Sequence, residues 1–190
     1  MTLKDLLYKV SLLEVKGSTE IEISSVEFDS RKIQSDSLFV AQSGTQVNGH
    51  DFIEVAIQKG ASAIICEVLP VGLIENVTYL KVANSSVALG IVAANLYDNP
   101  TEKLQLIGIT GTNGKTTTAT LTYNLLELMG CPSVLISTIR TIVHGEIYDS
   151  THTTPDILTI NKILSKAVEK GCEYAVMEVS SHGIHQDRIA

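Results

Sequence analysis

Apolar and polar positions follow two periods along this chain of 190 residues, one typical of strands and the other of helices. The predicted strands are 20–28, with a break near 24–25, then 36–42, 63–68, 77–82, 104–110, 133–139 and 173–179. The predicted helices are a short one opened by Thr2-x-x-Asp5, then 51–59, 86–97, 115–129 and 154–171, and a hairpin is expected at 141–149. This alternation of strands and helices predicts an α/β fold with mostly parallel, doubly wound sheets.

The pattern divides near Asn99-Pro100-Thr101, because proline cannot continue the helix before it. We therefore expect a small N-terminal α/β domain over 1–100 and the first part of a second domain over 101–190. In that second part, Thr154 and Pro155 are predicted as the N-cap and the first residue of the last helix. Only about three parallel strands precede the end of the chain, which suggests a truncated domain whose terminal strands have open edges.

Charge and composition narrow the class of protein. The chain has 14 Lys and Arg against 21 Asp and Glu, a formal net charge of −7. Nonspecific binding to nucleic acid or to anionic membranes favours net positive charge, so we expect neither partner. The three cysteines are scattered without a Cys-x-x-Cys pair, which argues against a disulfide framework or a zinc knuckle. No signal peptide or membrane-spanning run is predicted, and we expect a cytoplasmic protein.

The strongest chemical signal is Gly-Ile-Thr-Gly-Thr-Asn-Gly-Lys-Thr-Thr-Thr at 108–118, between a predicted strand and a predicted helix. The strict G-x-x-x-x-G-K-[ST] pattern fails, because no glycine stands five residues before Gly114. The loop is therefore a variant that uses Gly111 and Gly114, whose freedom lets backbone N–H groups turn toward a phosphate. In such a loop Lys115 contacts the β- and γ-phosphates, and Thr116 places its hydroxyl on Mg²⁺. The alternative is an ordinary glycine turn before a helix.

Glu178 ends the predicted strand 173–179, at the edge where doubly wound sheets bind ligands. A carboxylate at the end of a buried strand needs a cation or hydrogen-bond donors, so we prefer a metal ligand to a surface or ion-pair glutamate. Two other interpretations of this region are weaker. A nucleophile at Ser180 lacks a G-x-S-x-G elbow, and a zinc pair at His182 and His185 lacks a third ligand. His50 and His144, elsewhere in polar or turn segments, are expected at the surface.

The loop Gly-Thr-Asn-Gly-Lys-Thr-Thr resembles the ATP loop of the Mur ligases, which build the peptide stem of bacterial peptidoglycan. Folylpolyglutamate synthetases have a similar loop, but usually with Gly-Ser after the lysine, so Thr116-Thr117 favours the Mur ligases. Three further motifs follow the family's order: Asp-Ser-Arg at 29–31, Thr-Thr-Pro-Asp at 153–156 and Glu-Val-Ser-Ser-His at 178–182. Together they resemble the branch that adds the third amino acid of the stem.

The resemblance implies a role for each matching residue. It places the uridine of a UDP-sugar near Phe28 and Ser30, beside the stretch Thr45-Gln46-Val47. Phe28 alone is equally well read as a core aromatic residue. The muramoyl-peptide substrate is assigned to Thr153, Thr154, Ser180, Gln186 and Arg188. ATP is assigned to Gly111, Thr112, Asn113, Gly114, Lys115, Thr116 and Thr117, Mg²⁺ to Thr116 and Glu178, and catalysis to Lys115 and Glu178.

The activity implied by the resemblance is ATP-dependent amide formation on UDP-MurNAc-L-Ala-D-Glu. The substrate carboxylate takes the γ-phosphoryl group to give an acyl phosphate and ADP, and the amine of diaminopimelate or lysine then attacks. In the family, a second metal site and the domain that selects the amino acid lie beyond Arg188, so we expect the chain alone to bind ligand as a monomer without ligating. The alternatives are a non-catalytic UDP-sugar-binding module and a P-loop NTPase or kinase for another substrate.

Overall fold

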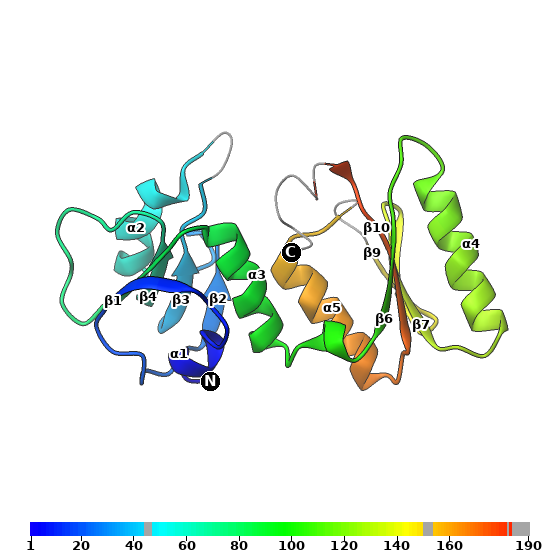
Figure 1. Cartoon of the computed structure of the whole chain (residues 1–190), viewed down its shortest axis with the longest axis horizontal. Coiled ribbons are helices and arrows are strands. Elements are labelled where there is room, and N and C mark those ends of the chain that lie inside the picture. Colours follow the sequence, from blue (N-terminus) through cyan, green and yellow to red (C-terminus); the bar gives the residue numbers. More distant parts are fainter. Residues whose placement is uncertain (44–46, 150–153, 182, 184–190) are drawn as a thin grey trace. The chain divides into compact units, whose positions relative to one another are not determined.

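The computed structural model describes residues 1–43, 47–149, 154–181 and 183. The chain forms two compact units, Met1–Leu96 and Tyr97–Ala190, which are described separately below (Figure 1). Within the described residues, no helix is long and apolar enough to cross a membrane.

The first unit contains a five-stranded sheet in the order β1-β5-β4-β3-β2. The strands β2 to β5 run parallel to their neighbours, and β1 is antiparallel to β5. The strands are β1 (Leu12–Lys16), β2 (Ser25–Glu27), β3 (Ser37–Val40), β4 (Ala61–Cys66) and β5 (Thr78–Val82). The helices are α1 (Leu3–Leu6), α2 (Ile53–Gln58) and α3 (Ser85–Leu96), and the 3-10 turn η1 (Gly49–Phe52) leads into α2.

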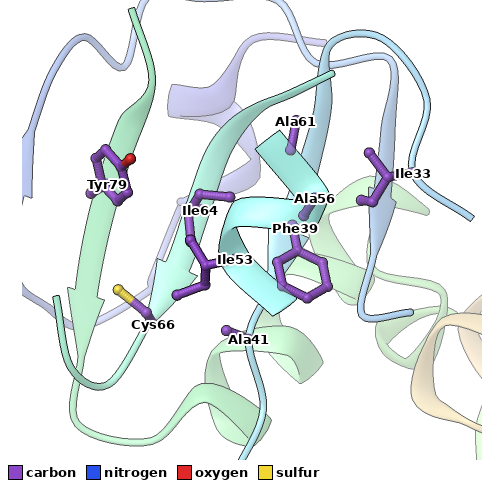
Figure 2. Packing of buried hydrophobic residues seen from close by; sticks show 9 residues of the cluster. All are labelled: Ile33, Phe39, Ala41, Ile53, Ala56, Ala61, Ile64, Cys66 and Tyr79. Atoms are coloured by element: carbon purple, nitrogen blue, oxygen red, sulfur yellow. The ribbon is translucent and has the colours of Figure 1, made fainter. Parts of the chain in front are cut away.

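The central strands of this sheet are buried on both faces, as parallel strands require. Every residue of β3 is at most 1% exposed. On one face, Ile53 and Ala56 of α2 pack among Phe39, Ile64 and Tyr79, which come from three adjacent strands (Figure 2). Helix α3 lies on the other side of the sheet and packs against α1 (Figure 1). Helices on both faces thereby hold the sheet rigid, and the loops that follow β2 and β3 start from fixed strand ends.

The second unit contains a five-stranded sheet in the order β6-β10-β7-β8-β9. Strands β6 and β7 run parallel to β10 between them, and the hairpin β8–β9 adds antiparallel strands beside β7. The strands are β6 (Gln105–Ile109), β7 (Ser133–Ile136), β8 (Arg140–Val143), β9 (Glu146–Asp149) and β10 (Tyr174–Glu178). The helices are α4 (Lys115–Leu128) and α5 (Ile157–Glu169), with a 3-10 turn η2 (Pro100–Glu102) before β6. Figure 1 shows α4 and α5 on opposite faces of this sheet, and a separate apolar cluster lies under each helix.

The predicted fold class, an α/β protein with two mostly parallel sheets, is confirmed. Helix α5 has one apolar face, whose members are buried or packed against the core: Ile157, Ile160, Ile163, Leu164, Ala167 and Val168. Strand β1 was not predicted. Leu13 and Val15 of β1 are 61% and 40% exposed, so this edge strand lacks an apolar inner face that its sequence could reveal.

Two predicted boundaries in the second unit are wrong. The run predicted as a strand over 133–139 leaves the sheet after Ile136, because Ser137 forms a tight turn with Arg140. The last helix is capped by Asp156 and not by Thr154: the Asp156 carboxylate accepts the Thr159 backbone N–H at 2.9 Å. Aspartate is as good an N-cap as threonine, and here the Thr154 hydroxyl is engaged at the end of β10.

Candidate functional site

The loop between β6 and α4 bends sharply before the helix begins. Gly111 has φ +145° and Gly114, the N-cap of α4, has φ +78°, backbone conformations that favour glycine. The first N–H groups of α4 have no partners within the helix, and together with the helix dipole they form an anion-binding end. The Lys115 ammonium lies close by and donates to the Gly111 carbonyl oxygen at 2.7 Å. This arrangement places N–H donors and one cation around the mouth of the loop.

A cleft of about 380 Å³ opens at the carboxyl ends of the central strands of the second sheet. Its lining residues are Thr112, Asn113, Gly114, Lys115, Thr116, Thr117, Thr138, Glu178 and Ser180. Of the residues that the resemblance assigns to ATP, only Gly111 is not among them. The cleft is therefore lined by backbone amides, hydroxyls, one ammonium group and one carboxylate, a set suited to phosphates and a hard cation.

The Glu178 carboxylate lies at the base of this cleft and is 0% exposed. Its Oε2 accepts from the Thr116 hydroxyl at 2.9 Å and from the Thr138 hydroxyl at 3.1 Å, and its Oε1 accepts from the Thr138 backbone N–H at 3.0 Å. The register of the sheet explains this position, because Glu178 stands beside Ile109, the last residue of β6. The buried carboxylate is thus stabilised by three donors, one from the first turn of α4 and two from the turn after β7.

The donor chemistry of this corner fits Mg²⁺. The Thr116 hydroxyl and the Glu178 carboxylate are hydrogen-bonded neighbours and are both hard oxygen ligands. Among the described residues, no group of three His, Cys, Asp or Glu side chains could enclose a metal. Mg²⁺ commonly binds through one or two protein oxygens, with phosphate oxygens and water completing its coordination. The residues present therefore suit a magnesium–nucleotide complex better than an isolated metal ion.

Sequence reasoning missed Thr138, which contributes two of the three donors to Glu178. The apolar run 133–139 predicts a strand through this position, and a strand residue would point to one face of the sheet. The turn that begins at Ser137 instead brings Thr138 back to the cleft. The available clue was the pair of hydroxyl residues, Ser137 and Thr138, directly after the apolar residues 134–136.

Two residues assigned to the muramoyl-peptide substrate lie beside the same strand end. Thr154 is 1% exposed, and its hydroxyl donates to the Glu178 carbonyl oxygen at 3.1 Å and accepts the Ser180 backbone N–H at 3.1 Å. The Ser180 hydroxyl lines the cleft and accepts the Gly183 N–H at 3.0 Å. The other predicted substrate residues, Thr153, Gln186 and Arg188, lie outside the described residues, as do His182 and His185.

A second cavity, of about 550 Å³, lies within the first unit. Its lining residues are Phe28, Asp29, Ser30, Arg31, Phe39, Gln42, Val47, Gly49 and Phe52. It contains the predicted uridine residues Phe28, Ser30 and Val47, whereas Thr45 and Gln46 lie outside the described residues. Phe52, which is 37% exposed, was not predicted as a residue of this cavity. The sequence predicts a regular helix from residue 51, whereas Phe52 ends the 3-10 turn η1.

The polar rim of this second cavity is held by short-range contacts. Arg31 donates to both carboxylate oxygens of Asp29, and these hydrogen bonds lower the pKa of Asp29 to about 2. Lys59, at the end of α2, donates to the Ser30 carbonyl oxygen at 3.0 Å and fixes the backbone there. These contacts fix the backbone of the loop after β2, and the Ser30 hydroxyl takes no part in them.

His50 is not the exposed residue that the sequence suggested. It is half-buried, and its Nε2 accepts the Glu67 backbone N–H at 2.9 Å while its Nδ1 lies 2.9 Å from the Asn48 side-chain oxygen. The Glu67 carboxylate in turn accepts from Ser43 and from Ser85. This network attaches the two ends of the loop that contains Val47 to the end of β4. His144 is exposed, as expected.

Comparison with known proteins agrees with the predicted resemblance. Residues 22–97 match a model of the Mur ligase family catalytic domain, and residues 109–190 match a model of the Mur ligase middle domain. The chain therefore belongs to the Mur ligase family.

Within the family, the chain is similar to proteins named UDP-N-acetylmuramoyl-L-alanyl-D-glutamate–2,6-diaminopimelate ligase. Those of Cytophaga hutchinsonii and Bacteroides fragilis are each 47% identical to it, and the match covers 100% of this chain but 39% of theirs. A solved structure of a ligase with the same name covers the whole chain with a TM-score of 0.79 at 25% identity, and 38% of that structure is matched. A Thermotoga maritima MurF ligase solved in complex with ADP matches 83% of the chain and 32% of its own length, with a TM-score of 0.54 at 26% identity.

Proposed function

We propose that this chain is the N-terminal part of an ATP-dependent ligase that adds diaminopimelate to UDP-MurNAc-L-Ala-D-Glu. The observation that carries the proposal is the cleft in which the phosphate loop, Lys115 and the buried Glu178 meet. We assign UDP-sugar binding to a domain over residues 1–100 and ATP binding to a domain over 101–190. Diaminopimelate is preferred to lysine because the similar ligases carry it in their names.

In this proposal the second unit holds the triphosphate end of ATP. The N–H groups at the start of α4 bind phosphate oxygens, and Lys115 exchanges its contact with the Gly111 carbonyl for the β- and γ-phosphates. Thr116 and Glu178 would hold Mg²⁺, which neutralises charge on the transferring phosphoryl group when bound. A substrate carboxylate that attacks the γ-phosphorus becomes an acyl phosphate, which an amine can then attack. Lys115 and Glu178 are thus proposed as the catalytic residues of this part.

The first unit is proposed to bind the uridine diphosphate end of the sugar substrate. Phe28 and Phe52 supply aromatic surface at its cavity, and an aromatic ring favours a planar base by stacking. The Ser30 hydroxyl offers a polar partner at the same rim, beside the stretch Thr45-Gln46-Val47. Thr153, Thr154, Ser180, Gln186 and Arg188 are retained as the proposed contacts for the muramoyl peptide. We propose a cytoplasmic location, since the reaction consumes ATP, and we retain the monomer as the proposed oligomeric state.

Ligand-observed NMR with this chain tests both assignments. Saturation transfer is expected to the uracil and ribose protons of UDP-MurNAc-L-Ala-D-Glu and, in a separate sample, to ADP with Mg²⁺. Phe28→Ala is expected to weaken the first effect only, and Lys115→Ala to weaken the second only. Because each variant changes one unit only, its retained binding of the other ligand controls for the amount of active protein, and the dispersion of its amide NMR spectrum verifies that the changed unit is folded.

The same experiment separates the alternatives. A kinase or NTPase for another substrate would bind ADP but show no contact with uridine. A non-catalytic UDP-sugar module would bind the sugar nucleotide but not ADP. The reaction itself is tested with the full-length protein by following ADP release in the presence of UDP-MurNAc-L-Ala-D-Glu, ATP, Mg²⁺ and either diaminopimelate or lysine. Release that needs diaminopimelate supports the proposal, and release with lysine alone would overturn that part of it.

A further inference from the structure

The turn between β7 and β8 is locked by one buried hydroxyl. Ser137 is 1% exposed, and its hydroxyl donates to the Arg140 carbonyl oxygen at 2.8 Å. The Ser137 Oγ accepts the Arg140 backbone N–H at 3.3 Å, and the Ser137 backbone N–H donates to the Arg140 carbonyl oxygen at 3.2 Å. Three hydrogen bonds thus close a turn in which only Thr138 and Ile139 lie between the bonded residues. These hydrogen bonds hold the backbone of Thr138 in place.

This turn presents Thr138 to the Glu178 carboxylate through two groups at once. The Thr138 N–H reaches Oε1 at 3.0 Å and its hydroxyl reaches Oε2 at 3.1 Å, so both carboxylate oxygens are bound by one residue. Thr116 contacts only Oε2, at 2.9 Å. Two contacts to both oxygens fix the plane of a carboxylate, whereas a single contact leaves it free to rotate.

Thr116 and Thr138 have different numbers of partners in the proposed site. Thr116 stands at the start of α4, where its hydroxyl would be shared between Glu178 and a bound cation. Thr138 makes no such second contact in the proposed mechanism, and its donors remain available when the Thr116 hydroxyl reorients. A carboxylate that is fully buried needs these remaining donors, because an unsatisfied buried charge is strongly unfavourable.

We infer that Thr138 is a positioning residue, which orients the Glu178 carboxylate for a magnesium–nucleotide complex. The inference rests on the proposed ATP site and extends it to a residue from a different loop. Thr138 is itself exposed and need not touch the nucleotide. Its effect passes through Glu178, so it should act on the response to Mg²⁺ and leave the binding of the metal-free nucleotide nearly unchanged.

The test compares Thr138→Val with Thr138→Ser in this chain. Valine keeps the branched shape and the backbone N–H but removes the hydroxyl, whereas serine keeps the hydroxyl. The affinity for ADP is measured by titration calorimetry in Mg²⁺ and again in EDTA. The readout is the dissociation constant in EDTA divided by the dissociation constant in Mg²⁺. We expect Thr138→Val to reduce this ratio by about tenfold, the value of one hydrogen bond to a charged group, without changing the affinity in EDTA. Thr138→Ser should keep most of the wild-type ratio.

Three results would overturn the inference that Thr138 orients Glu178. An unchanged ratio in Thr138→Val would overturn the inference and leave the proposed function standing. An equal loss of affinity in Mg²⁺ and in EDTA would show a general disturbance of the loop, and would overturn it too. If the wild-type chain shows no response to Mg²⁺ at all, the proposed ATP site fails and the inference fails with it. Circular-dichroism melting of both variants verifies that the fold is retained.

Discussion

The buried carboxylate of Glu178 can be neutralised without changing its shape, and this makes Glu178→Gln an informative substitution. The amide oxygen of glutamine can occupy the position of Oε1 and accept the Thr138 N–H. Its NH₂ group then occupies the position of Oε2 and faces the hydroxyls of Thr116 and Thr138, which can accept as well as donate. All three hydrogen bonds survive, and only the charge is lost.

The expected change in stability follows from two opposing effects. A hydrogen bond to a charged group is worth about 1.5–3 kcal/mol and a neutral one about 1 kcal/mol, so the three contacts weaken together. Burying a carboxylate costs several kcal/mol, and glutamine removes that cost. Because the two effects are similar in size, we expect the free energy of unfolding of the second unit to change by no more than about 1 kcal/mol. Glu178→Ala loses all three contacts and leaves a hole, and should destabilise by about 2 kcal/mol or more.

The assay is native-state hydrogen exchange, followed by mass spectrometry on peptides from α4 and β10. It reports on peptides of the second unit alone, whereas a measurement on the whole chain averages over both compact units. The matched readout is the effect of Mg²⁺ on ADP affinity, which Glu178→Gln should abolish. If Glu178→Gln is as unstable as Glu178→Ala, the negative charge of Glu178 itself stabilises the second unit, and our reasoning is wrong. If Gln is stable but keeps the full response to Mg²⁺, the assignment of Glu178 as a metal ligand is wrong.

Four further outcomes are expected. Lys115→Ala in the full-length enzyme should lower turnover about 100-fold in an ADP-release assay. Phe28→Ala should weaken UDP-sugar binding about tenfold by calorimetry, through loss of stacking. Arg31→Ala should raise the pKa of Asp29 from about 2 toward 3.8 in a carboxyl NMR titration. Since that folded-state pKa is depressed, the pair stabilises the wild type above about pH 4, and this contribution is lost as the pH falls toward 2. Asp156→Ala should destabilise α5 by about 1 kcal/mol, seen by hydrogen exchange, and little change would exclude its role as N-cap.

Much of the fold could be predicted because its strands are apolar and its helices have apolar faces. Strands such as β4 and β10 are buried in parallel sheets and appear in the sequence as continuous apolar runs. The prediction fails where the environment of an element departs from this rule. Strand β1 is an edge strand with exposed apolar residues, and β2 is only three residues long, so the alternation over 20–28 predicts too long a strand there.

The parts of the candidate site that are local in sequence could also be predicted. The loop proposed to bind phosphate lies between β6 and α4, and the position of Glu178 follows from its place at the end of a buried strand. Thr138 and Phe52 could not be found in this way. Their positions depend on a tight turn after β7 and on a 3-10 turn before α2, which arise from a few side-chain contacts and from the packing of the sheet. Neither leaves a periodic pattern in the sequence.

Thr154 was predicted as the N-cap of the last helix, but its hydroxyl makes other hydrogen bonds in the structure. Both Thr154 and Asp156 have side chains able to cap α5, and the sequence alone does not choose between them. Because Asp156 provides the cap, the helix starts at Ile157 and Thr154 is left in the segment before it. There its hydroxyl lies between the Glu178 carbonyl and the Ser180 N–H. The segment that enters α5 is thereby bound to the strand end that carries the Glu178 carboxylate, and the cleft is supported from both faces of the sheet.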